Sequence, residues 1–101
     1  MKLFQLLLPL LDNRGVPFGE ETFRKVRAEL AEKFGGLTAF TRAPAEGLWK
    51  SEGETKRDDI LVFEVMAPEI DRPWWQAYRA KLEQLLRQDE IVIRVQDVEI
   101  V

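Results

Sequence analysis

Apolar residues recur along this chain with two different spacings, one typical of strands and one typical of helices. Residues 2–8 predict a strand covered on both faces, because after Lys2 both sides of an extended backbone are apolar except at Gln5. Residues 37–42 predict a second strand, and residues 56–66 predict a third. Residues 90–101 predict the last one. The chain therefore contains four expected strands.

Two further segments have the spacing of amphipathic helices, at residues 20–34 and 72–88. The apolar stripe of the first helix contains Phe23, Val26, Leu30 and Phe34. The stripe of the second contains Trp75, Tyr78, Leu82 and Leu85. Asp71 is suited to cap the start of the second helix, and Gly35 and Gly36 are suited to end the first.

The resulting order is strand, helix, strand, strand, helix, strand. This order predicts an α+β domain of the ferredoxin-like βαββαβ type, with an antiparallel sheet ordered fourth, first, third, second strand. Right-handed crossovers place both helices on one sheet face. At 101 residues we expect one domain, residues 1–101.

The alternation of side chains assigns one sheet face to the helices and leaves the other bare. The helix face is assigned to Phe4, Leu6, Leu8, Leu61, Phe63, Val65, Ile91, Ile93 and Val95. The opposite face is mixed, but it is too apolar to stay wet over a whole sheet. We therefore expect a homodimer that packs sheet against sheet about a two-fold axis, as in dimeric α+β barrels.

The bare face carries polar residues near the middle of its strands: Gln5, Glu64, Arg94 and Arg42. In one interpretation they form a structural set of ion pairs and hydrogen bonds that fixes the dimer register. In the other they form the floor of a small polar cavity. There Glu64 acts as the catalytic base, Arg94 or Arg42 holds an anionic group, and Gln5 also contacts the ligand.

The two middle strands are joined by a long hairpin that has a β-bulge expected near Pro44. We expect a long connection over residues 42–57. Trp49 in this segment either packs on the core edge or a partner subunit, or forms the wall of a lid over the cavity. The adjacent acids Asp58 and Asp59 point to opposite faces of a strand, so no metal site is predicted.

Composition narrows the chemistry. The chain has no histidine and no cysteine, which excludes a thiol nucleophile, a disulfide, a Cys/His zinc site and a Ser-His-Asp triad. No cofactor is expected. The net charge of −3 disfavours nucleic-acid binding. The longest apolar run, residues 6–11, is too short for a membrane span, so we expect no membrane association and a cytoplasmic location.

Three short motifs, Gly36-Leu37-Thr38, Gly47-Leu48-Trp49 and Arg57-Asp58, resemble an uncharacterised family of small bacterial domains. The resemblance implies a ferredoxin-like domain and no established activity. In inferred architecture the chain also resembles dimeric α+β barrels, which include cofactor-free monooxygenases and lactone isomerases. Many of those enzymes use a histidine, which this chain lacks.

Two functions therefore stay open. The first is a homodimeric domain that binds a small molecule or a protein partner without catalysis. The alternative is a cofactor-independent enzyme of the monooxygenase or isomerase type, acting on a small anionic or aromatic substrate in a sheet-face cavity. The two differ in whether a cavity of several hundred Å³ opens near Glu64.

Overall fold

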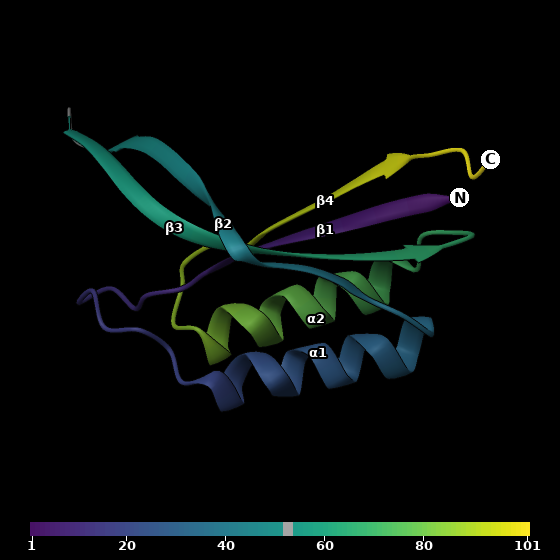
Figure 1. Cartoon of the computed structure of the whole chain (residues 1–101), viewed down its shortest axis with the longest axis horizontal. Coiled ribbons are helices and arrows are strands. Elements are labelled where there is room, and N and C mark those ends of the chain that lie inside the picture. The colour runs from purple at the N-terminus through teal and green to yellow at the C-terminus, as the bar shows by residue number, and fades with distance from the viewer. Residues whose placement is uncertain (52–53) are drawn as a thin grey trace.

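Four antiparallel strands form one sheet in the order β2-β3-β1-β4, and both helices cover the same face (Figure 1). The computed structural model describes the backbone of residues 1–51 and 54–101, and the side chains of residues 1–40 and 60–101. The elements are β1 (Lys2–Pro9), α1 (Glu20–Phe34), β2 (Thr38–Ser51), β3 (Glu54–Ala67), α2 (Arg72–Leu85) and β4 (Val92–Asp97). The predicted α+β fold and strand order are confirmed. Over the described residues, neither helix is long and apolar enough to cross a bilayer.

The helix ends follow local signals. α1 ends at Gly35, whose φ of 75° lies in the left-handed region and whose N–H donates to the carbonyl of Ala31. α2 begins at Asp71, whose carboxylate accepts a hydrogen bond from the N–H of Trp74 at 3.2 Å. α2 is shorter than predicted, because Arg87 has a φ of 53° and cannot continue a right-handed helix.

The β2–β3 hairpin is longer than the sequence indicated. The register shifts between Phe40 and Ala45, which confirms the bulge expected near Pro44. Beyond the bulge, pairing resumes at Ala45 with Ile60 and continues toward the tip. The long loop expected over residues 42–57 was therefore wrong, because the described backbone there forms two paired arms. These arms extend beyond the ends of the helices (Figure 1).

The core lies between the sheet and the helices. Its buried residues are Phe4, Leu6, Leu8, Phe23, Val26, Leu30, Leu61, Phe63, Val65, Trp75, Tyr78, Leu82, Leu86 and Ile91. The expected helix face is thus confirmed on β1 and β3 but not along all of β4. There Ile93 is half-buried and Val95 is 41% exposed, because α2 leaves a groove beside this edge strand.

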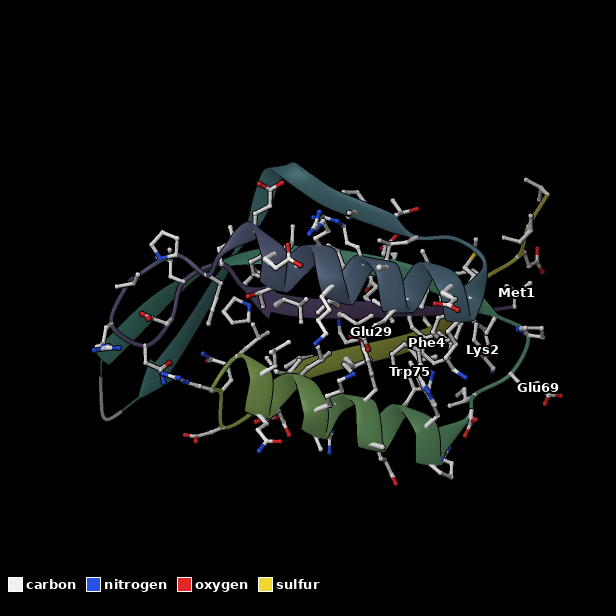
Figure 2. All side chains as sticks on the ribbon, turned by 90° about the horizontal axis from the view of Figure 1, so that it is seen from below. Met1, Lys2, Phe4, Glu29, Glu69 and Trp75 are labelled. Atoms are coloured by element: carbon white, nitrogen blue, oxygen red, sulfur yellow. The ribbon has the colours of Figure 1, made fainter. Side chains whose placement is uncertain are left out.

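Two neighbouring tryptophans divide between the core and its rim. Trp75 is buried and stacks on Phe4, with ring centroids 4.4 Å apart, and Figure 2 shows both rings between the two helices. Trp74 is half-buried. The difference follows from the turn of about 100° between successive residues of a helix.

Candidate functional site

The strand register arranges the bare sheet face in rows that cross the sheet. Neighbouring strands align four polar residues, which we call the polar row: Arg94, Gln5, Glu64 and Thr38. The next row along the strands is apolar, and we call it the apolar row: Val92, Leu7, Val62 and Phe40. The bare face therefore combines a line of polar groups with a parallel line of hydrophobic side chains.

Gln5 and Glu64 are joined inside the polar row. The side-chain amide of Gln5 donates a hydrogen bond to Oε2 of Glu64 at 2.6 Å, and the pair is part-buried. Arg94 lies across from Gln5 on its other side and is exposed. Glu64 and Arg94 form no ion pair with each other, because Gln5 lies between them and the two residues are two strands, or about 10 Å, apart.

A hollow of about 390 Å³ opens beside Glu64. It lies where α1 ends and β2 begins, and the residues that line it include Glu64, Thr38 and the apolar Leu3 and Leu37. Glu64 forms no ion pair with a described residue. No group of three metal-ligating side chains occurs among the residues whose side chains are described. The hollow can therefore offer one carboxylate, one hydroxyl and an apolar wall.

A second groove, of about 210 Å³, lies on the other side of the sheet between α2 and β4. Phe4 and Trp75 form its floor, and Arg72, Gln76 and Arg79 line it along α2. Sequence reasoning missed this groove. The spacing of the three polar residues in the sequence already places them on one side of the helix. The same spacing is typical of an ordinary solvated helix surface, so it does not by itself indicate a groove.

An aromatic cluster fills the outer surface between the helices. Trp74 stacks on Tyr78 with centroids 4.8 Å apart, and Nζ of Lys33 lies 4.5 Å from the Trp74 ring centroid. Lys81 forms an ion pair with Glu29 at 2.7 Å, which links α2 to α1. The Tyr78 hydroxyl is buried without a hydrogen-bond partner among the described residues, and burial raises the pKa of this phenol.

Two predicted site residues fall outside the described side chains. Arg42 and Trp49 both lie in β2, so their backbone belongs to the hairpin arm. Their roles in holding an anion and walling a cavity stay predictions. Among the residues proposed for the site, the described part of the structure joins Gln5 with Glu64 and places Arg94 in the same row.

Solved structures with this arrangement of elements include proteins of several kinds. The divalent cation tolerance protein CutA1 from Thermus thermophilus is 14% identical, with a TM-score of 0.62 over 97% of this chain and 84% of that one. A phage SAM lyase in complex with S-methyl-5'-thioadenosine is 12% identical, with a TM-score of 0.62 over 95% and 80%. The PII-like protein CutA from Nostoc is 15% identical, with a TM-score of 0.55 over 98% and 82%.

No known protein family and no curated protein sequence matches this chain. The solved structures share so little sequence identity with this chain that the similarity shows only a common fold. It supports the ferredoxin-like domain implied by the sequence resemblance, whereas membership of the uncharacterised bacterial family stays a prediction.

Proposed function

We propose that this protein is a homodimeric binding domain that recognises a small molecule or a protein partner without catalysis. The proposal depends on one observation, the polar row and the parallel apolar row on the bare sheet face. Phe40, Val92 and Met66 on this face are each more than two-fifths exposed, although they are large apolar side chains. Burying them against a second copy removes this apolar surface from water.

Charge complementarity supports a second copy of the chain as the partner. We place a two-fold axis between the two sheets, parallel to the strands and opposite Gln5. This axis packs the polar row of one copy against the polar row of the other, with the order of residues reversed. Arg94 of one copy then faces the partner's Glu64, and the reciprocal pair forms on the other side. The apolar rows meet in the same operation, because rotation about this axis does not change position along the strands. A dimer with this register pairs each Glu64 with an arginine and also buries both apolar rows.

The names of the similar folds favour binding over catalysis. Two of them are named for divalent cation tolerance and for likeness to PII, rather than for a reaction. Since the described residues form no three-ligand cluster, we do not extend cation binding to this chain.

Charge exchange tests the dimer directly. Light scattering should give about twice the chain mass of 11.8 kDa. Glu64→Arg and Arg94→Glu should each weaken the dimer by at least about tenfold, because each places like charges opposite one another. The double exchange should restore it. Glu32→Arg on the exposed surface of α1 is the matched control and should change nothing. A monomeric wild type at micromolar concentration, or a folded double variant that stays monomeric, would refute the proposal.

The enzyme of the monooxygenase or isomerase type is the second candidate, and the hollow beside Glu64 favours it. There Glu64 acts as base on a small anionic or aromatic substrate, held by Arg94 or Arg42 against Trp49. One similar fold, the phage SAM lyase, is named for a reaction.

Glu64→Gln separates the two functions, because the amide keeps the shape and removes the charge. If Glu64 faces the partner's Arg94, the substitution raises the dimer dissociation constant by about tenfold. If Glu64 lines a wet cavity, folding and dimerisation both stay at wild-type values. Sedimentation equilibrium and thermal unfolding of the same sample measure both quantities.

A further inference from the structure

The groove between α2 and β4 is an unassigned site with an aromatic floor. Phe4 and Trp75 line it, and their rings stack on one another at 4.4 Å with planes 16° apart, so the aromatic side of the groove is held rigidly. Ile93 and Val95 form the strand side, and Val95 is 41% exposed although its position in the strand faces the helices. A flat apolar ligand fits such a surface better than a bulky or polar one.

The helix side of the groove carries positive charge. Arg72 and Arg79 lie about 10 Å apart along α2, and Gln76 lies between them on the same side. Neither arginine forms an ion pair with a described residue. The acid nearest to Arg72 in the sequence, Asp71, accepts a hydrogen bond from the N–H of Trp74, and the acid nearest to Arg79, Glu83, accepts one from the N–H of Ile91. The guanidinium groups are therefore available to bind an oxyanion in the paired, planar geometry that arginine favours.

We propose that this groove binds a small ligand with a flat apolar body and an oxyanion head, either a carboxylate or a phosphate monoester. The apolar body packs against the exposed side chain of Val95 next to Trp75, and the head is held by Arg72 or Arg79. A volume of about 210 Å³ limits the body to the size of a single ring system. The inference names the ligand class and rests on the proposed role as a binding domain.

The groove and the proposed dimer surface lie on opposite faces of the sheet. The groove lies beside α2, which covers one face of the sheet (Figure 1), whereas the polar and apolar rows belong to the opposite face. A ligand in the groove therefore leaves the dimer surface uncovered. The failure of one proposal can consequently be told from the failure of the other.

The test is a titration of the full chain, labelled with ¹⁵N, with three probes of one ring each. Benzoate and phenyl phosphate carry the two kinds of oxyanion, and benzamide is the neutral counterpart of benzoate. At least one of the anions should shift the amide resonances of Trp75, Gln76 and Val95. Benzamide should bind at least about tenfold more weakly, because it has no charge for the arginines. The proposal is overturned if neither anion shifts these resonances, or if benzamide binds as tightly as the preferred anion.

Single substitutions then locate the head group. Arg79→Gln and Arg72→Gln remove one charge each, and at least one of them should weaken binding of the preferred anion by about tenfold. Arg24→Gln removes an exposed arginine from α1 and should leave the affinity unchanged. Light scattering of each variant reports the dimer separately. Wild-type affinity in both α2 variants, or an equal loss in the α1 control, would refute the assignment whatever the oligomeric state.

Discussion

At the scale of single residues, Tyr78 shows how packing and hydrogen bonding can disagree. Its ring is buried and stacks on Trp74, yet its hydroxyl has no hydrogen-bond partner among the described residues. A buried hydroxyl without a partner costs about 1–3 kcal/mol, because its hydrogen bonds to water are lost and not replaced. The helical spacing in the sequence predicted that the Tyr78 ring is buried. It gave no information on whether the hydroxyl has a hydrogen-bond partner.

Tyr78→Phe should raise the free energy of unfolding by about 1 kcal/mol, because it keeps the stacked ring and removes the unsatisfied hydroxyl. Urea denaturation measures the difference. Tyr78→Leu is the control, and it should destabilise the protein by removing the stacking on Trp74. If Tyr78→Phe is less stable than wild type, the hydroxyl makes a hydrogen bond in solution.

The wild type and Tyr78→Phe also allow the pKa of Tyr78 to be tested through the pH dependence of stability. Burial raises the pKa of the Tyr78 phenol above its ordinary value of 10.0, and Glu29 adds to the effect. The unfolded chain therefore loses the phenolic proton first, so the stability of the wild type falls as pH rises above about 10. Tyr78→Phe should lack this part of the decline. If the free energies of unfolding of the two proteins change in parallel between about pH 9 and about pH 11, the pKa of Tyr78 is not raised by folding.

At the scale of elements, the bounds of α1 were predicted accurately from local signals, whereas the length of β2 and the exposure of Val95, which depend on distant segments, were not. α1 begins and ends where its spacing and Gly35 indicated. β2 was expected to stop at residue 42, but pairing with β3 continues beyond the bulge to Ser51. The bulge near Pro44 was predicted, since a bulge can accommodate a residue without an N–H, but the pairing beyond it was not assigned to the same strand. Likewise, the exposure of Val95 depends on where α2 lies, which alternation along β4 does not specify.

The start of α2 gives the prediction for this scale. Asp71→Ala should lower the free energy of unfolding by about 1 kcal/mol, because the N–H of Trp74 loses its hydrogen bond and the first turn loses a negative charge. Asp71→Asn is the matched control and should retain most of the stability, since asparagine also caps helices. Denaturant titration measures both. An unchanged midpoint for Asp71→Ala would show that the cap does not form in solution.

At the scale of the whole molecule, the sequence predicted the fold, the strand order and three residues of the polar row, Gln5, Glu64 and Arg94. The linear order of six elements leaves few closed arrangements, and the right-handed crossover rule selects among them. The sequence also placed Glu64 and Arg94 on one face. It did not indicate that Gln5 would hold Glu64 and separate the two charges, because that depends on the rotamer of one amide.

Phe40→Asp should dissociate the proposed dimer without unfolding the protomer. Phe40 ends the apolar row and is 47% exposed, so its core contacts are few, whereas a carboxylate there is buried against the apolar row of a second copy. Sedimentation velocity should show at least about a tenfold loss of affinity. Val16→Asp replaces an exposed apolar residue outside the bare face and should leave the dimer intact. A dimer of wild-type strength in Phe40→Asp would place the interface elsewhere.

The position of β1 has a consequence for how the chain is made. β1 lies inside the sheet, yet both strands that flank it come much later: Lys2 pairs with Ala67 on one side and with Asp97 on the other. Contacts over such separations form late, because a long loop must close before they stabilise anything. During synthesis β1 leaves the ribosome first and then waits, with its hydrogen-bonding edges and core-facing side chains exposed, until β3 and β4 have emerged. The sheet can therefore be completed only after Asp97 is free, and the nascent chain is most open to aggregation before that point.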